Sequence, residues 1–324
     1  MKHAVGWLGA SGLVLLLGAA APPPEQRDND LAWTYPVGST PAPAGGWDRT
    51  RRLSLHAGSP TFTEAETHDR FHAVDWLPQS HPAMPKVVAD GRSPDVMACG
   101  FCHLPAGEGR PENAALAGLP RDYIIGQLRQ FASGERSSLS HDWAPSALMR
   151  TSAGHLTPTE SAAAADYFSR LKFTSRVRIV ETARVADPVA WNYVFVPGVG
   201  KPARPLGQRI VEGPSSRERW EHRDPHIAYT AYVPPGSLKR GEALAGGADG
   251  VQPCAACHGD DLRGGSLGGP PLAGRSPSYL FRQLEVFKAG ARTGGNAALM
   301  QAVTARLTTS DMIALAAWAG SRKP

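Results

Sequence analysis

Cysteine is scarce in this chain, with four residues in 324. All four fall in two pentapeptides, residues 99–103 and 254–258, and none lies near the amino terminus, where a lipid anchor would require one. Cysteine pairs that share a zinc ion usually stand about 15–20 residues apart. Because the two pairs here are separated by nearly half the chain, their spacing argues against a shared zinc site.

Both pentapeptides have the form C-x-x-C-H. Two thiols at this spacing can add to the two vinyl groups of one haem, and a histidine directly after the second can ligate the iron. A zinc knuckle or a redox disulfide would use the cysteine pair alone, yet histidine, only 11 residues in all, follows both pairs. The sequence therefore predicts two covalently bound haem c groups. The predicted attachment residues are Cys99, Cys102, His103, Cys254, Cys257 and His258.

The amino terminus carries an apolar run over residues 4–21, which starts after Lys2 and ends at three prolines. This pattern predicts a signal peptide over residues 1–20, with small residues at the cleavage site. An uncleaved membrane anchor is the alternative, because the run is close to spanning length. Haem is attached covalently outside the cytoplasm, so we expect a periplasmic protein without a membrane span once the signal is removed.

The chain has only a small excess of positive charge, with a formal net charge of +5. Most of this excess lies in residues 174–240, which hold 11 Lys and Arg against 6 acidic residues. Nucleic acid is a poor explanation in an exported protein. The basic segment is either a solvated surface that pairs with haem carboxylates, or a docking surface for an acidic patch on a redox partner.

The similarity between the two halves extends beyond the haem motifs. Residues 116–136 and 272–292 share L-A-G, then Y-x-x-x-Q-L-x-x-F, then G-x-R, at a constant offset of 156. Ile124, Leu128 and Phe131 fall at i, i+4 and i+7, which predicts one helix in each copy that ends near a glycine. The sequence therefore contains an internal duplication that includes the two haem motifs.

A methionine stands at a corresponding place in each half. Met149 and Met300 each come eight residues before a threonine, Thr157 or Thr308, that has an acidic residue three positions later. This spacing predicts a capping box and a helix in each copy, with the weaker box at Thr308. The two predicted helices carry large aromatic residues, Tyr167 and Trp318, at matching positions.

These motifs resemble the class I c-type cytochromes, and in particular their tandem diheme members. The resemblance covers residues 81–173 and 237–324 and implies all-α haem domains. It also implies axial pairs of His103 with Met149 and His258 with Met300. His141 and His155 remain alternatives to Met149 because both lie near it in the sequence.

The predicted fold class is mainly α, with two cytochrome c class I haem domains, an irregular N-terminal extension and a Pro/Gly-rich, partly β linker. The resemblance also implies a turn in the second copy at which the carbonyl of Pro270 accepts a hydrogen bond from the proximal histidine; the first copy has Ala114 at this place. Because prolines also argue against a helix before Cys99, we expect the extension to cover part of the first haem. The predicted segments are 1–20 (signal peptide), 21–80 (extension), 81–173 (first haem domain), 174–236 (basic linker, with strands at 177–180 and 191–196) and 237–324 (second haem domain).

A helix over residues 63–76 would place His68 and His72 on one face, as in a zinc-protease helix. Asp69 occupies the place of the usual glutamate, and no third ligand is evident. We therefore interpret these residues as a solvated helix face.

The resemblance implies an electron relay. Imidazole and thioether fill both axial positions of the iron and leave none open for a substrate. A dehydrogenase or quinol-oxidising complex is the expected donor, and a terminal oxidase or another cytochrome the expected acceptor. The alternatives are a diheme enzyme, either a peroxidase or a thiosulfate-oxidising cytochrome, and a haem-bearing electron-transfer subunit of a dehydrogenase complex.

Overall fold

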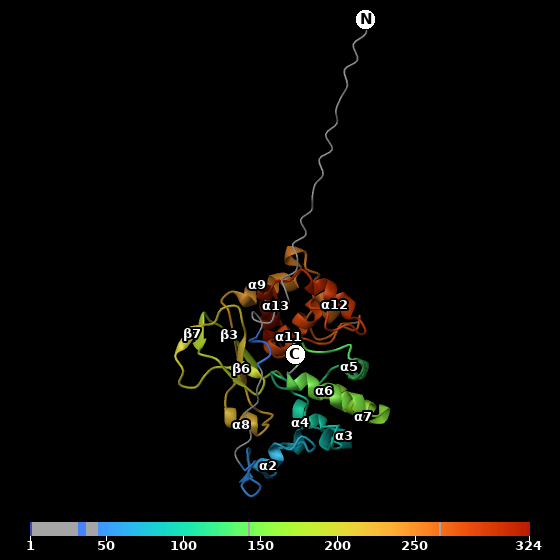
Figure 1. Ribbon diagram of the computed structural model, residues 1–324, viewed down its shortest axis with the longest axis vertical. Coiled ribbons are helices and arrows are strands. Elements are labelled where there is room, and N and C mark those ends of the chain that lie inside the picture. The colour runs from blue at the N-terminus through green and yellow to red at the C-terminus, as the bar shows by residue number, and fades with distance from the viewer. Residues whose placement is uncertain (2–31, 37–44, 142, 266) are drawn as a thin grey trace. The chain divides into compact units, whose positions relative to one another are not determined.

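The structure is a computed structural model that describes residues 1, 32–36, 45–141, 143–265 and 267–324 (Figure 1). The predicted signal peptide therefore lies outside the described residues, apart from Met1. The described secondary structure lies within one compact unit, Trp33–Pro324. Helices of the two sequence repeats and a sheet from the linker make up this unit.

The first repeat folds into five helices, which Figure 1 shows in green and teal. The helix predicted from the i, i+4, i+7 pattern is confirmed as α5, and it ends at Gly134 in the left-handed conformation (φ 80°). Thr157 and Glu160 form the predicted capping box at the start of α7. The helices are α3 (Lys86–Ala89), α4 (Cys99–His103), α5 (Arg121–Ser133), α6 (Ala144–His155) and α7 (Pro158–Ser169).

The second repeat forms a similar set of helices, with one more regular helix ahead of the haem motif. Helix α9 packs against α13 at Gly241, where a Cβ atom would lie 2.1 Å from the carbonyl oxygen of Ala314. Only glycine permits so close a crossing. The helices are α9 (Ser237–Ala245), η2 (Ala248–Gly250), α10 (Ala255–His258), α11 (Pro277–Lys288), α12 (Ala297–Thr304) and α13 (Thr309–Ser321).

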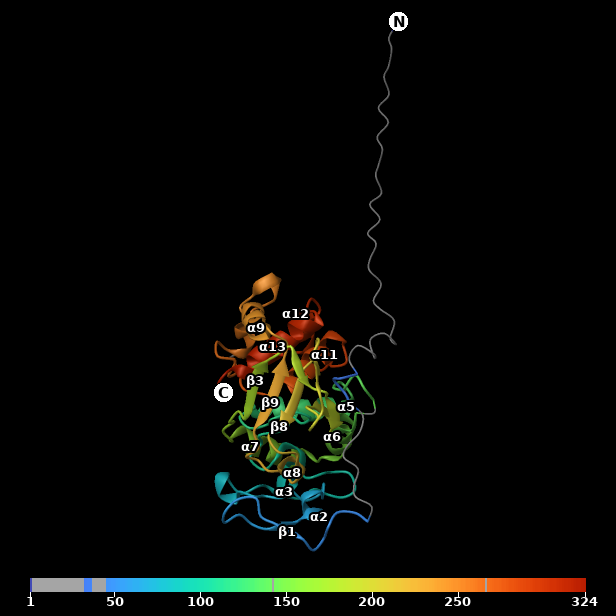
Figure 2. The ribbon, with the colours of Figure 1, turned by 90° about the vertical axis from the view of Figure 1, so that its left-hand side faces the viewer.

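The linker contains a three-stranded sheet in the order β3-β9-β8, seen face-on in Figure 2. Strand β3 (Val177–Glu181) pairs in parallel with β9 (Tyr229–Val233), and β8 (Val211–Pro214) pairs antiparallel with β9. The buried Glu212 of β8 accepts hydrogen bonds from Ser276 Oγ (2.8 Å) and Ser278 N (3.0 Å) at the start of α11. This carboxylate joins the sheet to the positive end of a helix in the second repeat.

The predicted strand over residues 191–196 is wrong as one element. It is a hairpin of β5 (Val189–Trp191) and β6 (Val194–Val196), joined by Asn192 and Tyr193 with φ values of 43° and 66°. Positive φ at both loop residues is typical of a two-residue hairpin turn. Two further strands, β4 (Arg184–Ala186) and β7 (Ala203–Pro205), form a second hairpin, and α8 (Arg217–Glu221) precedes β9.

The extension has little regular structure: β1 (Arg52–Leu53), β2 (Phe62–Thr63), α2 (Glu64–Thr67) and η1 (Pro78–Ser80). The predicted helix over residues 63–76 is therefore wrong beyond its first turn. His68 ends α2, whereas His72 forms an isolated bridge with Asp90, so the two histidines do not share a helix face. The extension is anchored by Trp76, which is buried and donates to His222 O at 2.8 Å.

Candidate haem-binding sites

A cavity of about 400 Å³ beside α4 brings together the residues predicted for the first haem. Cys99, Cys102 and His103 line it, and Met149 of α6 lines it as well. Apolar side chains from α5, α6 and α7 form much of the remaining wall. They include Ile124, Leu128, Phe131, Leu148 and Phe168. A largely apolar cavity of this size, with two thiols, an imidazole and a thioether, fits a haem.

The proximal histidine of this cavity is held by a backbone carbonyl. His103 Nδ1 lies 2.8 Å from Ala114 O, so Nδ1 carries the proton and donates it, because a carbonyl only accepts. Burial lowers the pKa of His103, which favours the neutral imidazole. The ring therefore presents an unprotonated Nε2, the atom that iron requires.

The structure also bears on the two alternative histidines. His141 and His155 are exposed, and neither is among the described residues that line the cavity. His155 Nδ1 instead contacts Thr151 O at 2.9 Å on its own helix. Met149 lines the cavity along with His103, and so do two further potential ligands, Met97 and His68.

The second predicted site repeats the proximal arrangement. His258 Nδ1 donates to Pro270 O at 2.8 Å, and burial lowers the pKa of His258. Cys254 and Cys257 lie at the start of α10 and within it. Met300 is half-buried on α12, so the two predicted axial ligands of this site come from separate elements.

The interpretation of His68 and His72 as a solvated helix face is wrong, because His72 lies outside the helix and the His68 side chain is only 11% exposed. His68 stacks on Trp47 with ring centroids 3.5 Å apart, and its Nε2 lies 3.7 Å from Glu221 Oε2. Across the described part of the chain, no three His, Cys, Asp or Glu side chains come together as metal ligands would.

Curated relatives of the chain are cytochromes or their partners in electron transfer, although no protein-family model matches it. Cytochrome c-554(548) of Halomonas halodenitrificans is 39% identical over 83 residues, which cover 26% of this chain and 99% of that protein. This chain belongs to the class I c-type cytochromes.

A wider match covers both halves of this cytochrome. A thiosulfate dehydrogenase electron acceptor of Thiomonas intermedia is 28% identical over 230 residues, or 69% of this chain and 78% of the relative. Cytochrome c4 of Pseudomonas aeruginosa is 34% identical over 89 residues, which cover 26% of this chain and 44% of the relative. The protein is a diheme cytochrome with two covalently bound haem c groups, and it relays electrons.

Solved structures give weaker matches. A thiosulfate dehydrogenase of Marichromatium purpuratum aligns with a TM-score of 0.48 and 27% identity, over 70% of this chain but only 37% of that longer chain. Cytochrome c4 of Pseudomonas stutzeri aligns with a TM-score of 0.44 and 23% identity, over 69% of this chain and 93% of that one.

In this cytochrome, segments outside the first repeat help to enclose the site of haem 1, the haem of residues 99–103. Trp47, His68 and Arg70 of the extension line its cavity, as do linker residues. The linker's Arg223 lies with its guanidinium carbon 3.4 Å from the ring centroid of Phe101. The same side chain donates to the carbonyl oxygens of Thr67 (2.9 Å) and Phe101 (3.2 Å), so one arginine joins linker, extension and haem motif.

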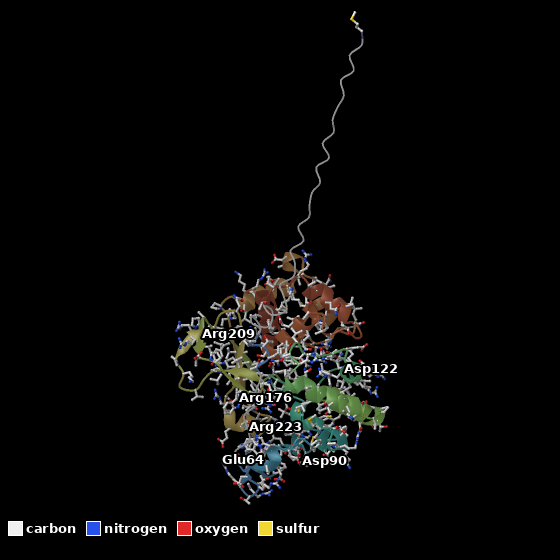
Figure 3. All side chains as sticks on the ribbon, in the orientation of Figure 1. Glu64, Asp90, Asp122, Arg176, Arg209 and Arg223 are labelled. Carbon is white, nitrogen blue, oxygen red and sulfur yellow. The ribbon has the colours of Figure 1, made fainter. Side chains whose placement is uncertain are left out.

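A buried ion pair lies on the same cavity. Arg110 Nε and Glu112 Oε1 are 3.0 Å apart, and each residue is about 5% exposed. Burial raises the pKa of Glu112, while burial and the like charge of Arg110 lower the pKa of Arg223 to about 9. None of these three residues could be assigned to the site from the sequence, because their proximity depends on the folded linker (Figure 3 labels Arg223).

The two repeats meet at a cluster that follows the duplication. Arg136 donates to Gln127 Oε1 of its own repeat (2.7 Å) and to Gln283 Oε1 of the other (2.9 Å). Arg292 makes the equivalent pair of bonds from the second repeat: it donates to Gln283 Oε1 of its own repeat (3.1 Å) and to Gln127 Oε1 of the first (2.5 Å). Each arginine also donates to the tyrosine of the other repeat, Tyr279 or Tyr123.

Both cluster arginines are buried, with exposed fractions of 7% and 5%. Among the described residues, neither forms an ion pair with a carboxylate. Arg136 and its partners Gln127 and Gln283 line the haem 1 cavity. Buried cations in this position fit the carboxylates that a haem carries.

Proposed function

We propose that this cytochrome is an exported electron relay that accepts electrons from a thiosulfate dehydrogenase. The observation that carries the relay is the haem 1 cavity, where imidazole and thioether both line the space for one haem. Similarity to a thiosulfate dehydrogenase electron acceptor over most of that relative supports the donor. Among the described residues, no helix has the length and apolar character to cross a membrane.

The proposed axial ligands are His103 with Met149 and His258 with Met300. Haem iron supplies one-electron redox chemistry when it is held in this way. The chain's own residues fix the imidazoles through the carbonyls of Ala114 and Pro270. They also exclude water from haem 1 through the extension and linker, which favours the less charged, reduced state.

The proposed organisation keeps the predicted boundaries. Residues 81–173 and 237–324 would each bind one haem, with the extension (21–80) and linker (174–236) as additions to that core. Residues 1–20 would direct export to the periplasm, where the haems are attached.

The exposed basic residues of the linker are the proposed docking surface for the donor. Arg178, Arg184, Lys201 and Arg204 are exposed, whereas other linker arginines are engaged within the fold. Arg219, for example, lies 2.5 Å from the buried Asp224. Association through the exposed set should weaken as salt screens it.

The test mixes the oxidised holoprotein with a purified thiosulfate dehydrogenase and thiosulfate, and follows haem reduction by absorbance. We expect rapid reduction that requires the dehydrogenase and slows with ionic strength. Reduction by thiosulfate alone at the same rate would contradict the relay and favour the enzyme. A rate that does not change with salt would exclude the linker as the docking surface.

A further inference from the structure

One side chain at the junction of the repeats bonds to the loops under both haems. Arg275 Nε donates to Pro271 O at 2.7 Å, Nη1 donates to Ala115 O, and Nη2 donates to Ala117 O at 3.3 Å. Pro271 and Ala115 are 156 positions apart, which is the offset of the duplication. Each directly follows the residue whose carbonyl accepts the proximal histidine's N–H. Arg275 therefore bridges equivalent carbonyls on the proximal sides of the two sites.

We propose that Arg275 is a positioning residue that holds the two proximal loops as one unit and acts mainly on haem 1. The proposal rests on the proposed function in one respect, because it takes His103 and His258 as iron ligands.

The stronger effect on haem 1 follows from the composition of the two loops. The second loop contains Pro270 and Pro271, whose rings fix φ at both positions. The first loop has Ala114 and Ala115 there, and alanine leaves the backbone more conformations to lose on folding. The haem 1 loop therefore depends on contacts from outside its own repeat.

A second arginine of the same repeat adds to this support. Arg282 Nη2 donates to Pro111 O, within the segment that leads to the haem 1 loop. The positions equivalent to Arg275 and Arg282 in the first repeat are Leu119 and Gly126, which have no side-chain donor. These arginines of the second haem domain therefore support the proximal side of the first, and the equivalent residues of the first domain give no such bonds in return.

Arg275 is itself held in place. It is 4% exposed, and its guanidinium carbon lies 4.7 Å from the ring centroid of Phe173, the last residue of the first haem domain. Burial lowers the pKa of Arg275 to about 10, so it remains a cation at neutral pH. The planar fork of a guanidinium fixes the separation of the carbonyls that it binds, whereas an ammonium carries its three donors on one rotating nitrogen at the end of a flexible stem and fixes that separation less firmly.

The expected effect runs through the proximal imidazole. A firm hydrogen bond from Nδ1–H to a carbonyl raises the basicity of the imidazole as a ligand and stabilises oxidised iron. A looser loop should weaken this bond at His103 and raise the potential of haem 1. Loss of the arginine's charge would act in the opposite direction, so the test has to separate the two effects.

Arg275→Lys keeps the charge and removes the fork. We expect the reduction equilibrium of haem 1 to shift toward the reduced state by about threefold to tenfold, and that of haem 2 by less. A tenfold shift corresponds to about 59 mV for a one-electron couple. Redox titration followed by NMR of the haem methyl groups assigns each change to one haem. Arg322→Lys is the matched control, because Arg322 is exposed and stacks on Trp318.

A rescue variant distinguishes loop positioning from general damage. Ala114→Pro gives the first loop the proline of the second, so in the Arg275→Lys background it should restore the haem 1 potential toward the original value. Arg282→Lys should shift the potential of haem 1 in the same direction as Arg275→Lys. It replaces Arg275→Lys as the test variant if Arg275 variants fold poorly.

Unchanged haem 1 potentials in both arginine variants would overturn the proposal. Equal shifts of both haems, with no rescue by Ala114→Pro, would also overturn it, because they would indicate a general electrostatic or structural effect. Failure of the proposed function is a separate result: the unaltered holoprotein would then lack the near-infrared band of Met–Fe(III) ligation.

Discussion

The two haem sites share one motif but differ in what surrounds it. In the first, Phe101 of the motif is buried (6% exposed) beneath Arg223. In the second, the equivalent Ala256 is exposed. Leu267, which follows the attachment motif in the sequence, is 68% exposed, and Leu299, which precedes Met300, is 63% exposed. The contrast teaches that C-x-x-C-H determines how haem is attached, whereas segments outside the repeat determine how far water reaches it. The attachment motif of haem 2 is therefore the less covered of the two.

The largest effect should come from the proposed axial methionines. Met149→Leu and Met300→Leu keep an apolar side chain of similar size and remove the thioether, so each should lower the near-infrared Met–Fe(III) band by about half. Absorbance spectra of the oxidised protein measure this. Met312→Leu, in the core of α13, is the control and should leave the band unchanged. If Met149→Leu leaves the full band, haem 1 has another ligand.

The next largest effect should come from opening the enclosed site. Arg223→Gln removes a partly buried cation that bonds to Thr67 O and Phe101 O, so we expect a loss of about 2–3 kcal/mol in the free energy of unfolding. A small hydrophilic reductant should then reduce haem 1 faster, with no change at haem 2. Denaturant unfolding and stopped-flow reduction measure the two effects. Arg306→Gln is a matched surface control; equal rates in both variants would mean that Arg223 does not restrict access.

A smaller effect distinguishes the equivalent helices α5 and α11. Glu285 is buried, and burial raises its pKa to about 7, whereas the equivalent Arg129 is exposed. Between its ordinary pKa and about 7, the folded chain retains a proton that the unfolded chain loses, so stability falls as pH rises through this window. Glu285→Gln should stabilise the protein by roughly 1–3 kcal/mol at pH 8 and by little at pH 4.

Urea unfolding at the two pH values checks this prediction. The exposed Glu242→Gln on α9 is the control. A Glu285→Gln effect that does not depend on pH would show that the carboxyl group does not titrate in this window.

The smallest effect should be the same in both repeats. Thr157 and Thr308 each accept a bond from the backbone N–H three residues later, and both capping boxes are complete. Thr308 N donates to Asp311 Oδ2 at 3.1 Å, whereas Thr157 N donates to Glu160 Oε2 at 2.8 Å, so the weaker box at Thr308 stays a prediction. Thr157→Ala and Thr308→Ala should each cost about 1 kcal/mol, measured by thermal or urea unfolding. A difference of more than about twofold would show that the two ends are not equivalent.

Local patterns were enough to predict the repeated helices. The apolar spacing of α5 and α11 and the threonine caps of α7 and α13 depend on residues within a few positions of one another. The proximal hydrogen bond at His258 was implied by the resemblance to class I c-type cytochromes, through the proline turn at Pro270. The equivalent bond at His103 uses Ala114, since a backbone carbonyl can accept whatever side chain it carries.

The enclosure of haem 1 could be predicted only in outline. The prolines before Cys99 argued against a regular helix there, and the structure has only the four-residue α3. This indicated that another segment covers the site, but the contacts of Trp47 and Arg223 depend on chain segments that meet only after folding. The helix predicted over residues 63–76 stopped after one turn because tertiary contacts of His68 and Trp76 outweigh local preference. The aligned repeats do carry one signal of this support in the sequence: Arg275 stands where the first repeat has Leu119.

The parallel pairing of β3 with β9 determines what a cut in the linker would do to the protein. The strand that leaves the first repeat and the strand that leads into the second lie side by side over five residues, from Val177↔Tyr229 to Glu181↔Val233. Residues 182–228 between them therefore start and end at the same sheet, and they include the exposed Val199. A protease that cut the chain beside Val199 would give two fragments with one haem each, and the sheet and the arginine cluster would keep them together as a working pair.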